Sequence, residues 1–382
     1  MITNARVVCP DVLHDVGWLA ISDGVIDALG AGTAPPDVMR AREVIDAEGR
    51  FLLPGFIDVH THGAVGHEAM DGDADGIRAM ARFYATRGVT AFLATTWTAG
   101  TAQTLTALRA IGEAMRAPTD GARVLGAHME GPYLSPRWLG AHDRAAIRRA
   151  DLAEARSFLD TGVVRRITLA PEVGDNLALV EECVRRGIAV SAGHTDATYD
   201  QMVAAVARGL RHVTHVYNAM RPLHHRDPGV VGAAFTITDL LAELIADDVH
   251  VHPVAARALA LAKGASGIVL VTDSLRPTGL APGIYEAGGK RVRADGGAVR
   301  LEDGTLAGSV LTMDAGLRNL LRATALPLAE LWRTASWNGA VAAGVASRKG
   351  ALVAGMDADL VVVDDAVNVR ITVVEGQVRH RA

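Results

Sequence analysis

The sequence predicts an α/β fold in which a closed (β/α)8 barrel, or TIM barrel, carries a small β-sandwich domain. Between residues 51 and 344, short apolar segments with strand character alternate with amphipathic helical stretches, as in parallel βα units. Eight such strand segments can be counted, which is the number that a closed barrel requires. At both ends of the chain, apolar and polar residues alternate at strand spacing instead.

The two ends of the chain are expected to form one small β domain together. Each end holds only a few short strands, too few to bury a hydrophobic face alone. The N-terminal pieces are ARVVCPD, GWLAISDG, VIDALG and REVIDAEGR, and the C-terminal ones are GALVAGMDADLVVVDD and VRITVVEGQVRH. The predicted domains are therefore residues 1–50 with 345–382 for the β domain, and residues 51–344 for the barrel.

The eight barrel strands predict where a functional site lies. In order they are FLLPGFIDVH, GVTAFLATT, ARVLGAHME, RRITLAPE, IAVSAGH, RHVTHVYNA, LLAELIADDVH and GIVLVTDS. Active sites of such barrels lie at the C-terminal strand ends, so the residues that end these segments are the first candidates. A segment with several glycine turns, at about residues 277–309, follows the eighth strand and is expected to form a β-hairpin insertion that folds over this face.

Composition narrows the classes of protein that the chain can belong to. With 382 residues, 49% of them hydrophobic, and a net charge of −5, the chain has the balance of a globular enzyme and no basic stripe for nucleic acid. No signal segment and no run of about 18 apolar residues is seen, so we expect a cytoplasmic protein without a membrane partner. The only cysteines, Cys9 and Cys183, cannot form a disulfide framework or a cysteine metal site. Any metal must be held by His, Asp or Glu.

Metal-competent side chains end several of the predicted strands. His60 and His62 share one side of the first strand, because side chains alternate with a period of two. Alone, this pair fits a metal site and a pair of polar rim residues equally well. Glu130, His194 and His215 end three other strands, and imidazoles with a carboxylate are typical ligands of a catalytic divalent metal. Together, these histidines and Glu130 favour a metal centre. Zinc and iron are the first candidate metals.

Glu130 has a competing interpretation. A buried carboxylate needs a cation or a set of donors, and a nearby arginine such as Arg144 would also serve. Asp273, in VTDS, lies where a carboxylate can take a proton from a metal-activated water and pass it to a leaving amine, although an N-cap role for a following helix is the alternative. His142 and His250 can orient a polar substrate or pack under loops.

The loop VYNAMRPLHHRDPG, which follows His215, is rich in hydrogen-bond donors. It contains Asn218, two adjacent histidines and Arg226, and an arginine can hold phosphate oxygens in a fork. A solvated surface loop fits the same residues equally well. The sequence thus leaves an anion site as one of two interpretations here.

Several of these segments resemble those of one known family. PGFIDVHTHG, GAHMEGPYLSP, SAGHTDATYD, THVYNAMRPLHHRDPG, VTDS, GTLAGS and the C-terminal GMDADLVVVD are similar, in the same order, to N-acetylglucosamine-6-phosphate deacetylases of the amidohydrolase superfamily. The resemblance covers nearly the whole chain. It implies a metal-dependent enzyme that removes the acetyl group from an N-acetylhexosamine 6-phosphate, with one or two divalent ions and a homodimeric assembly.

The resemblance also implies a role for each matching residue. Asp273 would be the general base and then acid, and Arg226 would bind the phosphate, in some members from the neighbouring subunit. The implied metal ligands are Glu130, His194 and His215 for the main ion and His60 with His62 for a second ion. The implied substrate-binding residues are Ala141, His142, Asn218, Ala219, Arg226, His250, Leu306, Ala307 and Gly308.

Two departures from the family pattern qualify these expectations. After Asp273 the chain reads Ser274, Leu275, Arg276 rather than small apolar residues, which leaves the sugar open and offers Arg276 as a second anion contact. Strand four ends in Pro171 and Glu172 without a lysine, so a carboxylated-lysine metal bridge is not expected. The alternatives to the deacetylase are an amidohydrolase for another N-acyl amine and, in a different class, a barrel that binds a sugar without hydrolysing it.

Overall fold

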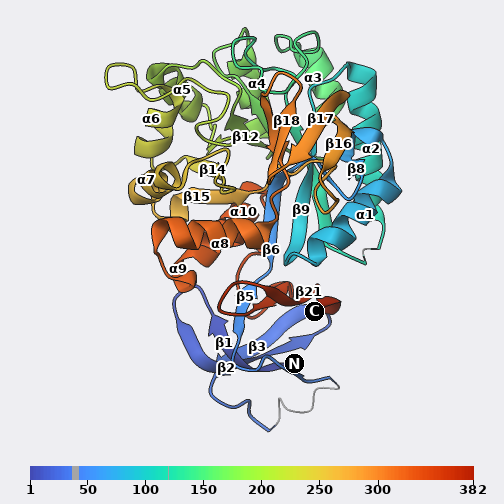
Figure 1. Cartoon of the computed structure of the whole chain (residues 1–382), viewed down its shortest axis with the longest axis vertical. Helices are drawn as coiled ribbons and strands as arrows, with labels where there is room; N and C mark the ends of the chain where they lie inside the picture. Colours follow the sequence, from blue (N-terminus) through green and yellow to red (C-terminus); the bar gives the residue numbers. More distant parts are fainter. Residues whose placement is uncertain (37–42, 119) are drawn as a thin grey trace.

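The computed structural model describes residues 1–36, 43–118 and 120–382, which form a barrel, a terminal sheet beneath it and a small sheet on its flank (Figure 1). None of the helices in these ranges has the length and apolar character that crossing a membrane requires. The predicted α/β architecture of a closed barrel with a β domain built from both termini is confirmed.

Eight parallel strands form the barrel, and they follow one another around it in chain order. The strand segments are almost continuously buried, as expected for a parallel sheet covered by helices on its outer face. The first and last strands meet at their ends, where Asp273 N donates to His60 O at 2.8 Å and His62 N donates to Ser274 O at 2.9 Å. The strands are β6 (Phe56–Thr61), β9 (Val89–Thr96), β10 (Arg123–Glu130), β11 (Val164–Leu169), β12 (Ala189–Ala192), β13 (His212–Val213), β14 (Leu241–Ile245) and β15 (Ile268–Val271).

Amphipathic helices surround the barrel, and α1 shows how the sequence specifies them. Asp73 caps this helix by accepting a hydrogen bond from the Asp75 amide, and the buried residues Ile77, Met80 and Tyr84 recur at helical spacing on the face toward the strands. The helices are α1 (Ala74–Ala85), α2 (Thr101–Arg116), α3 (Leu152–Leu159), α4 (Asn176–Arg185), α5 (Tyr199–Ala207), α6 (Gly229–Thr236), α7 (Pro253–Lys263), α8 (Met313–Thr324), α9 (Leu328–Ala335) and α10 (Trp337–Ala342), with short 3-10 turns η2 (Ala69–Asp71) and η3 (Ala265–Gly267).

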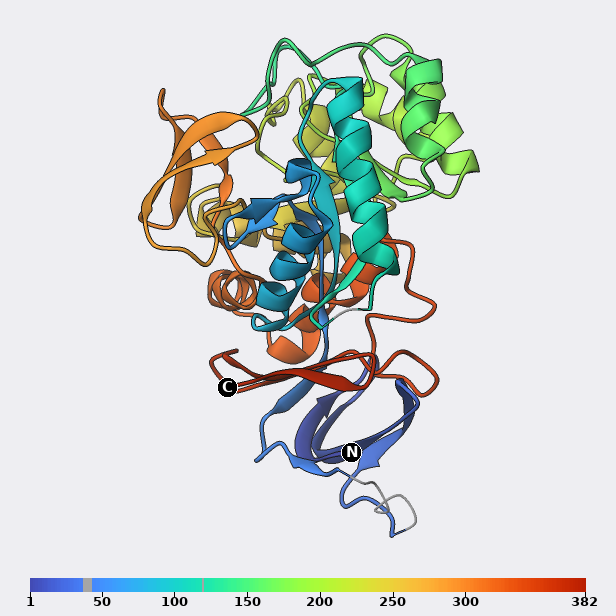
Figure 2. The same cartoon turned by 90° about the vertical axis from the view of Figure 1, so that its right-hand side faces the viewer.

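The terminal domain is one sheet bent into two layers, with the C-terminal strands lying over the N-terminal ones (Figure 2). Ile2, Leu19, Leu52 and Val362 belong to the apolar cluster that the bent sheet buries. Its order is β22-β21-β20-β5-β1-β2-β3, and β4 pairs with β1. The strands are β1 (Ile2–Val8), β2 (Leu13–Ser22), β3 (Val25–Ala31), β4 (Ile45–Asp46), β5 (Phe51–Pro54), β20 (Leu360–Val363), β21 (Val369–Val374) and β22 (Gln377–Arg381).

Two predicted strands differ from the structure. The segment 51–60 is not a single barrel strand, because β5 pairs with β1 and β20 of the terminal sheet and only β6 enters the barrel. The chain passes between the sheets at Gly55, whose amide donates to Asp359 O. The expected strand at 42–50 is reduced to β4, and its first residue, Arg42, lies outside the described residues.

The insertion after the eighth strand forms an antiparallel four-stranded sheet rather than a single hairpin. It lies on the flank of the barrel (Figures 1 and 2), and the Gly288 amide in its first turn contacts the Glu68 carboxylate. Its strands are β16 (Gly283–Ala287), β17 (Lys290–Asp295), β18 (Ala298–Leu301) and β19 (Leu306–Ser309). A separate two-stranded pair precedes α1 and consists of β7 (Gly63–Ala64) and β8 (His67–Glu68).

The buried Lys349 forms ion pairs with three carboxylates of the C-terminal segment. Lys349 Nζ lies 2.7 Å from Asp359 Oδ2, 2.8 Å from Asp357 Oδ2 and 3.4 Å from Glu375 Oε1. Glu375 also pairs at 2.5 Å with Arg123 at the start of β10, which ties the terminal sheet to the barrel. Burial would lower the pKa of Lys349, but the surrounding carboxylates raise it, so the ammonium form is retained.

Replacing Lys349 by Met is expected to lower the free energy of unfolding by about 3–5 kcal/mol, because carboxylates stay buried without their cation. The neighbouring Arg348 is the matched control, since it pairs with Asp357 at 2.8 Å while its side chain is 72% exposed. Arg348→Met should cost only about 0–1 kcal/mol. Urea unfolding of both variants measures the difference, and equal losses would contradict a structural role for the buried lysine.

Candidate active site

Six predicted site residues meet at the C-terminal ends of the barrel strands. Glu130 is the last residue of β10, and its two carboxylate oxygens face different imidazoles. Its Oε1 lies 3.1 Å from His215 Nε2 and 3.2 Å from His194 Nε2, and these two nitrogens are 3.1 Å apart. Its Oε2 lies 3.1 Å from His62 Nε2. Glu130, His194 and His215 thus form one compact group of ligand-type atoms.

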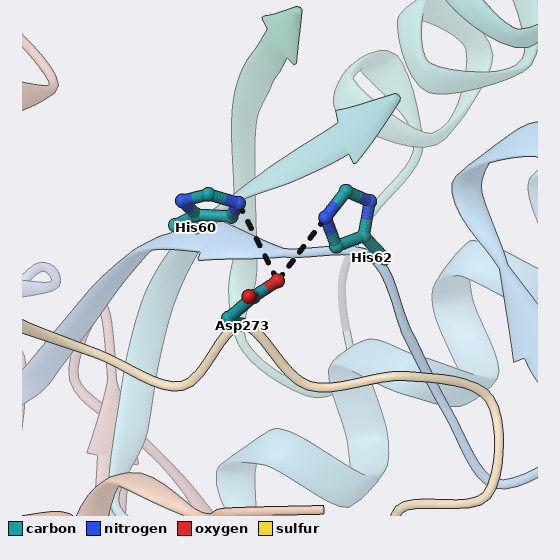
Figure 3. Close-up of side chains that lie close together, drawn as sticks. All are labelled: His60, His62 and Asp273. Carbon is teal, nitrogen blue, oxygen red and sulfur yellow. Dashed lines mark ion pairs between the residues drawn. The ribbon is translucent and has the colours of Figure 1, made fainter. Parts of the chain in front are cut away.

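A second group shares the same space and contains the predicted base. Asp273 Oδ1 lies 3.2 Å from His62 Nε2 and 3.5 Å from His60 Nε2, so the carboxylate faces both rings (Figure 3). His60 Nε2 is also 3.5 Å from Glu130 Oε1. The two groups are therefore adjacent parts of a single site rather than two separate sites.

The backbone takes an unusual conformation where three of these residues leave their strands. His194, His215 and Asp273 have φ angles of 47°, 29° and 49°, in the left-handed region that L-residues rarely adopt. Each such residue costs on the order of 1–3 kcal/mol unless its surroundings hold it in place. Their recurrence at the ends of three strands indicates that the barrel rim is built to aim these side chains inward.

The hydrogen bonds around the imidazoles fit a divalent cation. His194 Nδ1 donates to Trp138 O at 2.8 Å, and His60 Nδ1 lies 3.0 Å from Glu243 Oε2. These contacts use Nδ1, so Nε2 of both rings is left to offer a lone pair toward Glu130, and His60 Nε2 is buried without a hydrogen bond. Burial would lower the pKa of His60 and of His215, but the facing carboxylates raise both, and a divalent cation would take the place of the protons between these nitrogens and Glu130.

The charges in the site favour ionised carboxylates. Burial would raise the pKa of Glu130, but His60 and His142, among the imidazoles around it, hold that pKa well below its usual range. The pKa of Asp273 is likewise lowered by His60 and His62 against the effect of burial. Asp273 can therefore accept a proton at neutral pH.

His142 plays a different part from the ligand-type histidines. Burial, and then the nearby His194, lower its pKa to about 4, so the ring is neutral near pH 7. The Thr98 amide donates to His142 Nδ1 at 3.4 Å, which leaves the proton on Nε2, 3.3 Å from Glu130 Oε2. The ring thus offers a neutral N–H donor at the edge of the site.

A pocket of about 340 Å³ opens onto these groups, and most of the predicted substrate residues line it. Two do not. Ala307 is buried behind the wall that its neighbours form, and Arg226 lies in an exposed loop where its Nη1 contacts His225 Nε2 at 2.7 Å. The predicted residues that line the pocket are Ala141, His142, Asn218, Ala219, His250, Leu306 and Gly308.

Three of the competing interpretations are wrong. The ion pairs of Glu130 are all with histidines, and Arg144 is exposed. No helix begins at Asp273, so this residue is not an N-cap. Arg276 does not line the pocket, because its guanidinium pairs with Asp71 at 2.6 Å and with Glu68 at 3.5 Å.

Several residues of the site were not predicted from the sequence. Trp97 stacks on the His62 ring with centroids 4.4 Å apart, and Trp138 and Arg137 also line the pocket. The signal of Trp97 was its position directly after a predicted strand end, whereas Arg137 and Trp138 lie in the loop well beyond Glu130. Glu243 was also missed, although a carboxylate inside the apolar run LLAELIA carries the same signal that identified Glu130.

The insertion reaches the site through its first turn. Gly288 N donates to both Glu68 carboxylate oxygens, at 3.2 and 3.3 Å, and Lys290 Nζ donates to His142 O at 3.1 Å. A Cβ at Gly288 would lie 2.8 Å from the Trp97 indole, so this glycine lets the turn approach the ring that stacks on His62. The insertion therefore supports one wall of the pocket, as expected from its position in the chain.

Comparison with known proteins agrees with this geometry. Residues 51–379 match the amidohydrolase family. The chain is 37% identical to N-acetylglucosamine-6-phosphate deacetylase of Bacillus subtilis (strain 168), over 99% of this chain and 96% of that protein. It is 36% identical to N-acetylgalactosamine-6-phosphate deacetylase of Escherichia coli O157:H7, over 96% and 97%.

A solved structure is similar over the same span. A mutant N-acetyl-D-glucosamine-6-phosphate deacetylase from Mycobacterium smegmatis, in complex with N-acetyl-D-glucosamine-6-phosphate, superposes with a TM-score of 0.92 at 33% identity, covering 99% of this chain and 98% of that one. Fold and site thus define a hydrolase of the amidohydrolase type. The chain belongs to the amidohydrolase family and, within it, to the family of the N-acetylglucosamine-6-phosphate deacetylases.

Glu130→Gln is expected to lose bound metal, because this carboxylate contacts every one of the facing imidazoles. The affinity should fall by more than the roughly 10- to 100-fold that outer-shell changes cause. Glu182→Gln is the control, since Glu182 lies on α4 and pairs with Arg185 and Arg186 away from the site. Metal content after dialysis against a chelator measures both variants, and full retention by Glu130→Gln would remove Glu130 from the ligand set.

Proposed function

We propose that the protein hydrolyses the acetamide of an N-acetylhexosamine 6-phosphate, with N-acetylglucosamine 6-phosphate as the first candidate, and releases acetate and the amino sugar phosphate. The observation that carries this proposal is the convergence of Glu130, His194 and His215 beside an ionised Asp273 in one pocket. The near full-length similarity to deacetylases of this class supports it.

The metal-binding residues are Glu130, His194 and His215, with His60 and His62 as a second pair. A divalent cation held there would polarise the amide carbonyl and acidify the attacking water. Imidazole and carboxylate ligands suit zinc or iron, and metal supply often decides between such ions. Zinc and iron are the metals that we propose.

Asp273 is the proposed proton carrier. Its ionised carboxylate accepts a proton from the attacking water and then returns it to the amine nitrogen as the C–N bond breaks. The direction of its pKa shift supports the first step, because the carboxylate is deprotonated at neutral pH. One residue can thus serve both proton transfers, as the resemblance implies.

Two histidines at the pocket, His142 and His250, are proposed to orient the sugar and its acetyl group. The Nε2–H of His142 is a donor for a developing oxyanion. His250 Nδ1 lies 2.6 Å from Asp247 Oδ2, an arrangement that directs the other ring nitrogen toward a substrate hydroxyl. Asn218, Ala219, Leu306 and Gly308 complete the proposed sugar site, and Ala307 supports it from behind.

The phosphate is proposed to be bound by Arg226 of a second copy of the chain in a homodimer. Within one chain this arginine is exposed and lies outside the pocket lining. The pocket's own Arg137 is held at 2.6 Å by Asp196. Exposed Leu223, 52% accessible in the same loop, is the kind of residue that a subunit interface covers. The cytoplasmic location stays a prediction.

The two alternative functions, hydrolysis of another N-acyl amine and sugar binding without hydrolysis, require different residues in the site. Another N-acyl amine would need no phosphate contact, so the alternative amidohydrolase differs mainly at Arg226. A barrel that binds sugar without hydrolysis would not need an ionised carboxylate beside the imidazoles. The Asp273 geometry therefore favours an enzyme over a binding protein.

Acetate release from a panel of substrates tests the proposed function. With zinc or iron supplied, we expect hydrolysis of N-acetylglucosamine 6-phosphate, slower hydrolysis of the galactosamine epimer, and little hydrolysis of unphosphorylated N-acetylglucosamine. Asp273→Asn should lower kcat by roughly 10²–10⁴-fold, which is the typical contribution of acid–base catalysis, and should retain metal and substrate binding. Equal rates with and without the phosphate would favour the alternative amidohydrolase, and near-normal turnover in Asp273→Asn would remove the proposed base.

Mixed dimers test whether Arg226 acts across subunits. Consider a mixed dimer of one Arg226→Ala chain and one Asp273→Asn chain. If each site takes its arginine from the partner, the site of the Arg226→Ala chain has both its own Asp273 and an intact arginine, whereas the other site has neither. The activity of this mixed dimer should then reach about half that of the parent dimer, far above either variant alone. The control is the dimer of Asp273→Asn with the parent chain. Activity no higher than that of the variants would assign Arg226 to its own subunit or to no phosphate contact.

A further inference from the structure

A buried ion pair inside the barrel lies directly behind the site and has no part in the proposed chemistry. Arg166 of β11 and Glu243 of β14 both point into the barrel, and their side chains are fully buried. Arg166 Nη2 lies 2.5 Å from Glu243 Oε1. Neither residue lines the pocket, so neither can touch a substrate there.

The carboxylate of Glu243 joins this ion pair to both groups of metal-type ligands. Its Oε2 lies 3.0 Å from His60 Nδ1, and it also accepts a hydrogen bond from the His215 amide at 3.1 Å. The backbone of Glu243 continues the connection, because its carbonyl accepts from the Val216 amide at 2.9 Å. A single side chain thus contacts one residue of each group.

Glu243 is not itself part of a third metal site, although it lies close to His60 and His128. Both ring nitrogens of His128 are already engaged, with Val59 O at 3.0 Å and with Thr168 Oγ1 at 2.7 Å. The cation that faces Glu243 is the guanidinium of Arg166. Because Arg166 pairs with Oε1, Oε2 remains free to accept hydrogen bonds.

The contacts with His60 and His215 serve different purposes. A carboxylate at His60 Nδ1 fixes the proton on that nitrogen and leaves the Nε2 lone pair aimed at Glu130 and Asp273. The bond to the His215 amide holds a backbone whose φ of 29° is unfavourable for a residue with a side chain. Without an acceptor at this position, the His60 ring would be free to turn and the His215 backbone to relax.

We propose that Arg166 and Glu243 are positioning residues for the metal centre, in which Arg166 holds the Glu243 carboxylate and Glu243 fixes His60 and His215. The inference rests on the proposed function only in that the histidines bind a metal. The cost of burying an ion pair makes a purely stabilising role a poor explanation, since apolar replacements of such pairs often fold as well or better.

Two double variants separate positioning from stability. Arg166→Met with Glu243→Gln removes both charges and retains a carbonyl oxygen that can accept from His60 and His215. Arg166→Met with Glu243→Leu removes both charges and the acceptor. Lys349→Met, which disrupts another buried ion network, is the control for a stability loss that leaves the site intact.

Zinc affinity, measured by competition with a chromophoric chelator, is the main result, and thermal unfolding of the same samples is the second. The Gln variant should bind zinc within a few-fold of the parent, and the Leu variant roughly 10- to 100-fold more weakly, although both unfold near the parent temperature. Lys349→Met should lose stability and keep its zinc affinity. Equal zinc affinity in the Leu variant, the Gln variant and the parent would overturn the proposal.

A measurement on the parent protein covers the case in which the Leu variant does not fold. In the zinc-loaded protein with ¹⁵N-labelled histidine, His60 should show an Nδ1–H resonance that exchanges slowly with water and shifts in the Gln variant. A His60 proton on Nε2 would overturn the proposal. A parent protein that binds no zinc would instead contradict the proposed function, so the two failures are distinguishable.

Discussion

The carboxylate of Glu130, buried among imidazoles, is the constraint on which the rest of the molecule depends. An ionised carboxylate at the end of an apolar strand is unfavourable unless positive charge or hydrogen-bond donors surround it. Three other strand ends supply imidazoles to it, in β6 or just after β6, β12 and β13. Closure of the barrel is what brings these strand ends to the end of β10.

The outer parts of the protein maintain this arrangement from three sides. Trp97 and the turn of the insertion hold the His62 and His142 wall, through the stacked indole and the Lys290 contact. The Trp138 carbonyl holds His194. Behind the site, Arg166 and Glu243 contact His60 and the His215 backbone. Strained backbone at the strand ends is tolerated because these contacts oppose its relaxation.

The similarity to deacetylases and the geometry of the site support the same function by different kinds of observation. The family match gives the chemistry that related chains perform, and fold alone would not give it. The distances show that this chain has carboxylates beside a compact set of imidazoles, and His60 and His62 lower the pKa of Asp273 against the effect of burial. The proposed phosphate contact differs from the rest, because Arg226 lies on the surface of its own chain, outside the pocket lining, and the proposal assigns it to a second copy.

The sequence by itself determined the barrel, the terminal β domain and the identity of the ligand-type residues, because strand periodicity and polar residues at strand ends are local properties of the chain. It could not place β5, since Phe51–Pro54 and β6 form one apolar run and only pairing with β1 and β20 separates them. It left Glu130 open between Arg144 and a metal, because the choice depends on which side chains the closed barrel brings near. It also missed Glu243 and Arg166, whose contacts join residues far apart in the chain. Local pattern decides which residues end a strand, whereas only tertiary structure decides what each of them faces.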